Sequence, residues 1–544
     1  MDIPRLYMIP SAVSPGKVHS LFPNSTDADF DFNRDSDATR VNSEGLIERV
    51  GYYSAERVTN GGFDTDSNWS KDGWKIENGK AINTLASSGL NLYQGSVTSV
   101  GNTFKVVLDA VISAGGLKVL LGGGSGGYNE IGQASSTGTH TFVGVSNGTD
   151  NRILIQTLSG STIGSVIVDN VSVKQINDER ARLNYEIEGG LVNTKPSLLL
   201  EPQSTNLITY SEDFSQSYWF KDKVTATQKS IISPTGELNT SLIQETSYTS
   251  SIPKLDIETA ISLSAGTYTL SFYVKNNKGR YLGISFGSAS ERVRTNFDFE
   301  TNTFKSLNLS GSTTGTASFT TLGDFYRISI TATFPSTTAS KNTIVPLATD
   351  TYPFFALQDS DDRSFYIWGA MVEQQAFSTS YIPTNGSTQT RAAETCNGAG
   401  TSSILPTQGI LFTEVKVQQT GSTNGIIFIS NGTTSNLLML RYAPSHKFQV
   451  EATGGVNIIE DSARASGKYK VAIKYSSAGI ELWIDGSKAK ETSTATTATG
   501  INELGIGSSP YGNIVGCNVF DARVYNTKEM TNSEVDILLT KITS

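Results

Sequence analysis

Cysteine, histidine and charged residues are scarce in this chain. Its 544 residues include two cysteines, three histidines and only 17% charged residues. Cys396 lies in a Gly-rich stretch and Cys517 in a strand-like run, so we predict two free thiols, with Cys517 buried, and no disulfide framework. His19, His140 and His446 lack a second His or Cys at the spacing of metal ligands, which argues against a zinc site.

The sequence also lacks basic clusters and long apolar runs. The formal net charge is −9 at pH 7, whereas nucleic-acid binding needs grouped Lys and Arg side chains. No stretch approaches the ~20 apolar residues of a membrane-spanning helix. The start of the chain shows no basic segment followed by an apolar run, so no secretory signal is expected. We expect a protein made in the cytoplasm that neither binds nucleic acid nor inserts into a membrane.

Sequence signatures of catalytic sites are missing too. The glycine-rich run at 122–128 lacks the Lys-Ser/Thr ending of a phosphate-binding loop, and no helix follows its Gly-x-Ser-x-Gly pattern, so we interpret it as a hairpin loop. The acidic run at 359–362 is interpreted as a solvated loop, although the paired carboxylates of a glycosidase are brought together by the fold and not by the sequence. No repeats of the kind that build a β-helix depolymerase occur. We therefore predict that the chain is not an enzyme.

Residues typical of short strands and turns are abundant. Glycine occupies 51 positions, and Ser, Thr and Asn are frequent throughout. Apolar and polar residues alternate in runs such as 104–111, 266–275 and 364–373, which is typical of strands with one buried face. The chain is also too long for a single core. The predicted fold class is all-β, with multiple jelly rolls or β-sandwiches and an extended N-terminal arm.

Composition divides the chain into five segments. We predict an extended arm at 1–52, a jelly roll at 53–176, an irregular linker at 177–208, a second jelly roll at 209–395 and a last sandwich at 396–544.

Three short motifs predict local structure within these segments. The Leu run at 198–200, with prolines on both sides, predicts a short buried strand. The dipeptide Asp485-Gly486 predicts a hairpin turn, because both positions of such a turn need positive φ angles. The run from Thr531 to Glu534 has the spacing of a capping box and predicts the start of a helix.

Two tyrosines are the candidate carbohydrate-binding residues. Sugar binding needs an exposed aromatic face for the apolar side of a pyranose, with amides and carboxylates nearby for its hydroxyl groups. Tyr128, beside Asn129, and Tyr511, in the run 508–513, lie in polar, Gly-rich loops. The alternative is that each tyrosine pins a turn or contacts a neighbouring subunit. The tryptophans in strand-like patterns are predicted to be core residues: Trp69, Trp74, Trp368 and Trp483.

Three motifs resemble a family of phage fibre and head-spike proteins. They are RDSDATRVNSEGLIE at 34–48, PSLLLEPQSTNL at 196–207, and WGAMVE at 368–373 followed by TSYIPT at 379–384. The resemblance implies a fibre or spike on the virion surface of a tailed bacteriophage. It further implies a homo-oligomer, trimeric by family habit, whose arm and Leu-containing segment attach it to other virion proteins of the head or tail.

Two further segments resemble folds found in carbohydrate-binding proteins. NGGF at 60–63 and VDNVSV at 168–173 are similar to the ends of jelly-roll carbohydrate-binding modules. LWIDG at 482–486 and VFDARVYN at 519–526 are similar to concanavalin-like, laminin-G-like domains. Because a fold alone does not assign a sugar, the resemblance implies only that these domains are suited to adhesion to host-cell surface glycans.

The resemblance to jelly-roll modules also implies a structural calcium ion. Members of that group often hold calcium near the paired ends of the chain, which places the ligands at Asp64 and Asp169. No cofactor is otherwise required.

Two other functions remain open from the sequence. One is a purely structural head-decoration or tail component without glycan binding. The other is a capsule-degrading tailspike.

Overall fold

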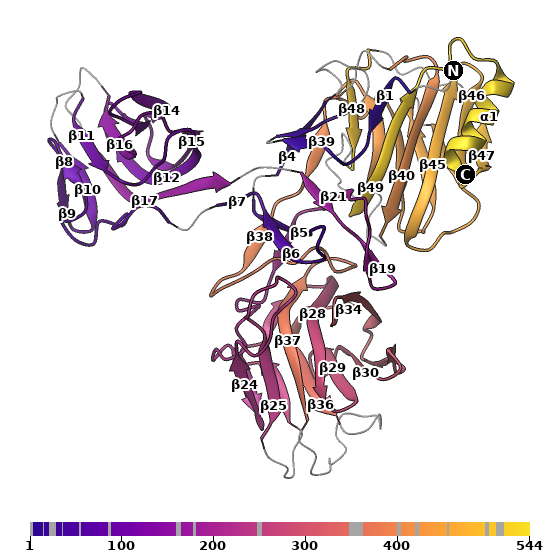
Figure 1. The fold of residues 1–544 in the computed structure, drawn as a ribbon, viewed down its shortest axis with the longest axis horizontal. Coiled ribbons are helices and arrows are strands. Elements are labelled where there is room, and N and C mark those ends of the chain that lie inside the picture. The colour runs from indigo at the N-terminus through magenta and orange to yellow at the C-terminus, as the bar shows by residue number, and fades with distance from the viewer. Residues whose placement is uncertain are drawn as a thin grey trace. The chain divides into compact units, whose positions relative to one another are not determined.

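The protein folds almost entirely as β-structure (Figure 1). The computed structural model describes residues 4–14, 16–20, 29–34, 36–53, 56–84, 89–158, 165–177, 181–246, 253–347, 363–399, 404–418, 424–453, 456–494, 500–507 and 516–544. They form two compact units, one of residues 51–179 and one of residues 1–50 with 180–544. The predicted all-β fold class is confirmed. No helix in these ranges is both long and apolar enough to cross a membrane.

The unit of residues 51–179 is a sandwich of two antiparallel sheets. One sheet has the order β15 (Gly138–Val145), β12 (Thr103–Ile112), β17 (Val166–Asn177), β10 (Lys80–Asn83) and β9 (Lys75–Glu77), with β7 (Tyr52–Tyr53) paired to β17. The other has the order β14 (Tyr128–Ala134), β13 (Leu117–Gly122), β16 (Arg152–Thr157), β11 (Asn91–Gln94) and β8 (Ser70–Lys71).

The two sheets of this unit enclose one apolar core. Successive side chains of a strand point to opposite faces, and the residues of β12 accordingly alternate between half-buried and buried. Trp69 and Trp74 lie in the core, 6% and 4% exposed, which confirms their predicted role. The glycine-rich run at 122–128 connects β13 to β14 as the predicted hairpin loop.

In the larger unit, strands between Trp219 and Glu373 form a second two-sheet sandwich. Its first sheet has the order β24 (Val224–Gln228), β25 (Ser241–Glu245), β37 (Ser364–Glu373), β28 (Gly266–Lys278), β34 (Phe325–Phe334) and β33 (Thr314–Leu322). Its second has the order β23 (Trp219–Asp222), β26 (Lys254–Ile257), β36 (Thr343–Leu347), β29 (Tyr281–Gly287), β30 (Arg292–Asp298) and β31 (Thr303–Phe304), with β32 (Asn308–Ser310) also on β30. Phe272, Ile284 and Phe297 lie in the core between them, each 0% exposed.

The C-terminal part of this unit is a third sandwich. One sheet has the order β18 (Arg182–Asn184), β21 (Ser197–Leu200), β49 (Cys517–Tyr525), β40 (Gly409–Val417), β45 (Gly467–Ser476), β46 (Gly479–Ile484) and β47 (Ser487–Thr492), with β1 (Leu6–Met8) on β49. The other has the order β2 (Val13–Ser14), β3 (Lys17–Val18), β4 (Phe30–Asn33), β39 (Thr395–Asn397), β48 (Glu503–Ile506), β41 (Asn424–Ser430), β42 (Leu437–Tyr442), β43 (Phe448–Ala452) and β44 (Val456–Ile459).

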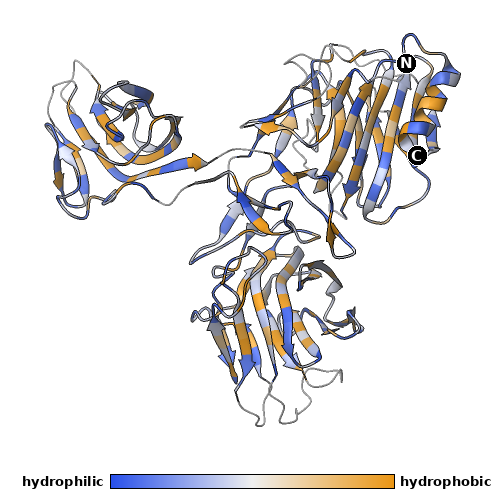
Figure 2. Cartoon of the chain, in the orientation of Figure 1, coloured by the Kyte–Doolittle hydropathy of each residue, from blue (hydrophilic) through white to orange (hydrophobic). Residues whose placement is uncertain are grey.

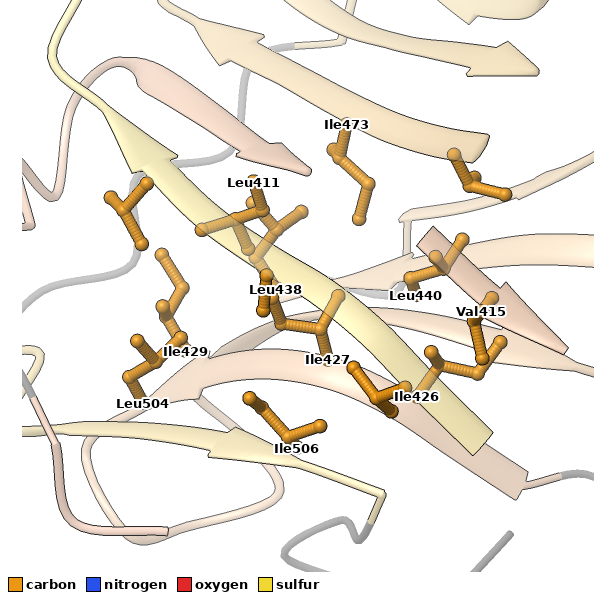
Figure 3. Packing of buried hydrophobic residues seen from close by; sticks show 14 of the residues in the cluster. Leu411, Val415, Ile426, Ile427, Ile429, Leu438, Leu440, Ile473, Leu504 and Ile506 are labelled. Carbon is orange, nitrogen blue, oxygen red and sulfur yellow. The ribbon is translucent and has the colours of Figure 1, made fainter. Parts of the chain in front are cut away.

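Aliphatic side chains from the two sheets interdigitate in this sandwich. Leu411 and Ile473 meet Leu438 and Ile506 in the core (Figure 3). Figure 2 shows the corresponding alternation of apolar and polar residues along the strands. Trp368 and Trp483, which belong to separate smaller clusters, are buried as predicted.

The N-terminal segment differs from the predicted extended arm. β1 pairs with β49, and β4 pairs with β39, so the described parts of residues 4–34 belong to the C-terminal sandwich. The alternation at Phe30 and Phe32 is the reason, since both rings enter the core. Cys396, in the Gly-rich stretch, lies in β39 and is fully buried. Both cysteines are free thiols and Cys517 is buried, as predicted.

Three local predictions are confirmed. The Leu run forms β21, which is buried along its length. Asp485 and Gly486 have φ angles of 46° and 81° and turn the chain between β46 and β47. Thr531 and Glu534 form a complete capping box at the start of α1 (Asn532–Thr543). The remaining strand pairs are β5 (Ala38–Val41) with β6 (Ile47–Val50), β19 (Ile187–Glu188) with β20 (Leu191–Val192), β22 (Ser204–Asn206) with β38 (Gln389–Arg391), and β27 (Ile261–Leu263) with β35 (Thr338–Ser340).

Candidate ligand-binding face

The outer face of the sheet β14-β13-β16-β11-β8 gathers aromatic, apolar and hydrogen-bonding side chains. Val119 and Leu121 on β13, and Ile153 on β16, point into the core. Because side chains alternate between the two faces, Leu120 and Leu154 point outward. Neither belongs to the core cluster, yet they are only 9% and 5% exposed, so neighbouring side chains on this face cover them.

An apolar row crosses the centre of this face. In the strand register, Tyr93 on β11 lies opposite Leu154 on β16, which lies opposite Leu120 on β13. Glu130 on β14 follows in the same row. The row is an apolar strip of a half-buried aromatic ring and two leucines that their neighbours cover, and a carboxylate borders it.

Arg152 lies at one end of the strip, between two tyrosines. Its guanidinium carbon is 4.8 Å from the centroid of the Tyr93 ring. Nη1 is 3.1 Å from a carboxylate oxygen of Asp150 and donates to the hydroxyl oxygen of Tyr128 at 3.5 Å. The hydrogen bond to Tyr128 raises the pKa of Arg152. The cation is therefore held in place beside the strip by three partners.

Amides and a second ion pair lie at the other end. The Gln156 side chain donates to Oδ1 of Asn91 at 2.8 Å. Lys118 lies 3.4 Å from Glu130, and the hydrogen bond from Gln133 lowers the pKa of that carboxyl. The strip is thus bordered on both ends by groups that donate and accept hydrogen bonds.

Tyr128 is part of this face and not of a free loop. It is the first residue of β14, 38% exposed, and pairs in register with Gly122, which also pairs with Arg152. A Cβ atom on Gly123 would lie 2.7 Å from the Tyr128 ring, at a φ of 91°. The glycine therefore makes room for the ring.

Tyr93 and Arg152 were missed by the sequence analysis. Both lie in short runs of alternating residues, at 91–94 and 152–157. That pattern predicts strands but does not indicate which strands are neighbours. Tyr511 and the acidic run at 359–362 lie outside the described residues.

The proposed calcium ligands lie near the ends of the same unit. The backbone N–H of Val171 on β17 donates to the carbonyl of Gly61 at 2.9 Å, which brings the opening segment to this strand. Asp64 is exposed, and Asp169 accepts a hydrogen bond from the N–H of Asn170 at 2.8 Å. Within the described ranges, no three or more His, Cys, Asp or Glu residues gather as a metal site. A calcium ion at Asp64 and Asp169 would need backbone or amide oxygens to complete its shell, and it stays a prediction.

A buried cluster of charged residues lies in the larger unit. Arg182 is within 2.8 Å of Glu201, Arg391 is within 3.1 Å of Glu201, and Arg34 is within 2.8 Å of Glu394. Arg182 also pairs with Glu394. These carboxylates are paired with protein cations, so we interpret the cluster as structural.

Comparison with known proteins gives structural likeness alone. No family model and no curated protein matches the chain. Among solved structures, it is similar to the CBM40 of Ruminococcus gnavus IT-sialidase bound to α2,3-sialyllactose, at 18% identity and a TM-score of 0.23, over 27% of this chain and 88% of that one. It is also similar to the tandem CBM22 domains of Paenibacillus barcinonensis Xyn10C, at 12% identity and a TM-score of 0.26, over 62% and 98%. A third similar structure is mouse laminin α1 LG4-5, at 11% identity and a TM-score of 0.18, over 51% and 86%. Values this low do not identify a function.

Proposed function

We propose that this chain is a non-enzymatic glycan-binding protein, displayed as a fibre or spike on the virion of a tailed bacteriophage. The observation that carries glycan binding is the row Tyr93–Leu154–Leu120 on the outer face of one sheet, with Arg152 and Glu130 beside it. The half-buried Tyr93 ring, which lies beside the covered leucines, offers an apolar surface to the C–H face of a pyranose ring. The bordering guanidinium, amides and carboxylates offer hydrogen bonds to its hydroxyl groups.

A glycan site on the face of a sheet is suited to weak, repeated binding. A single sugar on an exposed sheet buries little surface, so we expect each site to be weak. A homo-oligomer, trimeric in our proposal, would present several copies to one cell surface and raise the avidity without new contacts. The proposed partners are therefore further copies of the chain, other virion proteins and host surface glycans.

The virion location rests on the motifs at 34–48, 196–207 and 368–384. All three lie in the larger unit, and Arg34, Glu201 and Glu373 within them are buried. In this proposal the protein is made in the host cytoplasm and assembled onto the head or tail. The glycan-binding face lies in the other unit.

A glycan array with the purified full chain tests this function. We expect saturable binding to a subset of host-type glycans, and loss of that binding in Tyr93→Ala. Val143→Ala is the matched control, since Val143 is 54% exposed on the opposite sheet of the same unit. Equal binding by wild type and Tyr93→Ala would contradict the assigned face. Absence of binding to the array and to whole host cells would contradict glycan binding altogether and favour a structural virion component.

The non-enzymatic part of the proposal has its own test. The glycans that bind are incubated with the protein, and the appearance of new reducing ends is followed. We expect none. Release of sugar would favour the capsule-degrading tailspike instead.

A further inference from the structure

A pocket of about 220 Å³ lies in the larger unit, beside the buried cluster of charged residues. Its walls come from the hairpin β5–β6, the segment 184–187, the strands β33 and β34, the segment 378–381 and the end of β40. Thr320 and Thr321 in the lining are exposed, and the Lys416 side chain is 35% exposed. The pocket therefore opens to solvent, and a ligand can reach it.

Hydrogen bonds hold the wall segments in place. The Tyr185 N–H donates to the carbonyl of Val41 at 3.0 Å, and the Val41 N–H donates to Oδ1 of Asn184 at 2.9 Å. The Arg182 guanidinium donates to the carbonyl of Thr39 at 2.9 Å. These bonds join the hairpin β5–β6 to β18 and the residues that follow it. The pocket is therefore formed before a ligand binds, as is usual for ligand sites.

Arg327 on β34 lines this pocket with a fixed guanidinium. In the strand register it lies between Thr320 on β33 and Tyr273 on β28. Its guanidinium carbon is 5.3 Å from the centroid of the Tyr273 ring. Nη2 donates to the carbonyl of Thr379 at 2.6 Å and to Oγ of Ser271 at 3.3 Å. Among the described residues, its hydrogen bonds all use Nη2, which leaves Nη1 for a ligand.

Among the described residues of the lining, Arg327 carries the only charge without an ion pair. The other charged side chains of the lining are all paired: Arg40 with Glu48, Lys416 with Glu186, and Glu201 with Arg182 and Arg391. The lining therefore has one uncompensated positive charge, which favours an anionic ligand. A guanidinium matches the planar geometry of a carboxylate.

Groups that suit hydroxyl groups line the same pocket. Gln418, which follows β40, has an amide that both donates and accepts, and Tyr185 has a hydroxyl group and a half-buried ring. Thr320 and Thr321 add hydroxyl groups on the exposed side. None of these four side chains forms a hydrogen bond within the described ranges. They are free to bind the hydroxyl groups of a sugar, and the Tyr185 ring can contact its C–H face.

The volume of the pocket limits the ligand to one ring. Pockets for drug-sized ligands have about 300–1,000 Å³, and this one is smaller. A sugar ring with a carboxylate would use both the Arg327 cation and the free hydroxyl-binding groups. A simple carboxylate would leave those groups unused, and a neutral sugar would leave the cation without a counter-ion.

We propose that this pocket binds one acidic sugar ring, a hexuronic or sialic acid, as the terminal residue of a glycan. The carboxylate pairs with Arg327, the hydroxyl groups bind Gln418 and Thr321, and the ring lies against Tyr185. This site lies in the larger unit, and it does not depend on the face around Tyr93.

A ligand-observed NMR titration of the full chain tests this site. The probes are the methyl glycosides of glucuronic, galacturonic and N-acetylneuraminic acid, with glucose, galactose and acetate as comparisons. We expect an acidic sugar to bind at least tenfold more tightly than any of the three comparisons, and Arg327→Gln to weaken that binding at least tenfold. Arg49→Gln is the control and should bind as wild type does, because Arg49 lies on β6 outside the pocket with its side chain 53% exposed. Tyr93→Ala should not affect this binding, which separates the result from the function proposed above.

Melting temperatures show whether a loss of binding comes from a loss of structure. If Arg327→Gln melts as wild type does, weakened binding supports the site and retained binding overturns it. If that variant melts lower, Gln418→Ala decides: weaker binding with unchanged melting supports the site, and wild-type binding overturns it.

Three results with the wild type and Tyr93→Ala would also overturn the site. The first is no binding of any acidic sugar. The second is binding of acetate or a neutral sugar as tight as that of the acidic sugars. The third is binding that Tyr93→Ala abolishes and Arg327→Gln retains, since the acidic sugar would then lie on the Tyr93 face.

Discussion

Arg34 and Glu394, which are 360 residues apart in the chain, form a fully buried ion pair with Nη1 and Oε1 separated by 2.8 Å. Arg34 also donates to the carbonyl of Val50 at 2.7 Å. Arg182 shares the same carboxylate and reaches the carbonyl of Thr39 at 2.9 Å. The cluster therefore connects the N-terminal segment to residues that precede and follow the second sandwich.

Breaking this cluster should destabilise the larger unit strongly. Arg34→Met removes one cation and leaves Glu394 less fully paired in a buried site. Loss of one partner of a buried ion pair costs about 3–5 kcal/mol. The free energy of unfolding, measured by urea denaturation, should fall by that amount. Lys275→Met removes an exposed partner of Asp324 and should cost less than about 1 kcal/mol; equal effects of the two variants would contradict the structural role.

The same cluster predicts a loss of stability in acid. Burial alone would raise the pKa of Glu201, but Arg391 and Arg182 overcome it and lower the pKa to about 2. Because the folded-state pKa is below the ordinary value, the stabilisation is complete above about pH 5 and is lost as the pH falls toward 2. The shift corresponds to about 3 kcal/mol. Glu373, whose pKa is raised by burial, acts in the opposite direction.

Urea denaturation between pH 7 and pH 3 measures this effect. We expect the free energy of unfolding of the wild type to fall with pH. Glu201→Gln should start lower at pH 7 and show a weaker pH dependence. A variant whose pH dependence matched that of the wild type would show that Glu201 does not carry the effect.

The capping box of α1 gives a third prediction. Thr531 Oγ1 accepts from the N–H of Glu534, and the Glu534 carboxylate accepts from the N–H of Thr531 at 2.8 Å. Thr531→Ala should destabilise the C-terminal sandwich by about 1 kcal/mol. Ser533→Ala, an exposed position in the same turn, should change the stability little. Thermal unfolding of both variants decides, and equal melting temperatures would contradict the role of the cap.

Calcium is the fourth prediction, and it concerns the unit of residues 51–179. If Asp64 and Asp169 hold a calcium ion, chelation should lower the melting temperature of this unit, and added calcium should restore it. The double variant Asp64→Asn with Asp169→Asn should melt as the chelated wild type does. If the melting temperature is unchanged by chelator and calcium titration gives no heat of binding, the protein does not bind calcium at these residues.

The sequence predicts which segments form strands more readily than it predicts which strands pair with one another. The alternation at Phe30 and Phe32 indicates a half-buried strand, but pairing with β39 depends on residues remote in the chain. The glycines that follow Cys396 suggest irregular structure. Cys396 instead lies in a strand, because residues 395–397 pair with β4. Short signals held within one turn, such as Asp485-Gly486 and the Thr531 cap, are predictable because all the interacting groups are local.

The candidate site shows the same limit. Tyr128 is predictable from its loop composition. Arg152 contacts both Tyr128 and Tyr93, and it does so only because of the order of the strands β14, β13, β16 and β11. Nothing in the local sequence of either residue marks it as a neighbour of Tyr128. A face formed by several strands is a property of their register, which the sequence pattern of one strand does not contain.

The most direct test of glycan binding at the Tyr93 face is the affinity of the full chain for the glycan that the array selects, measured by titration calorimetry for wild type, Tyr93→Ala and Arg152→Ala. An aromatic contact is worth about 0.5–1.5 kcal/mol beyond its buried area, and a hydrogen bond to a charged group about 1.5–3 kcal/mol. We therefore predict that each variant binds at least fivefold more weakly and melts as wild type does. Wild-type affinity in both variants would contradict the assignment of the glycan to this face.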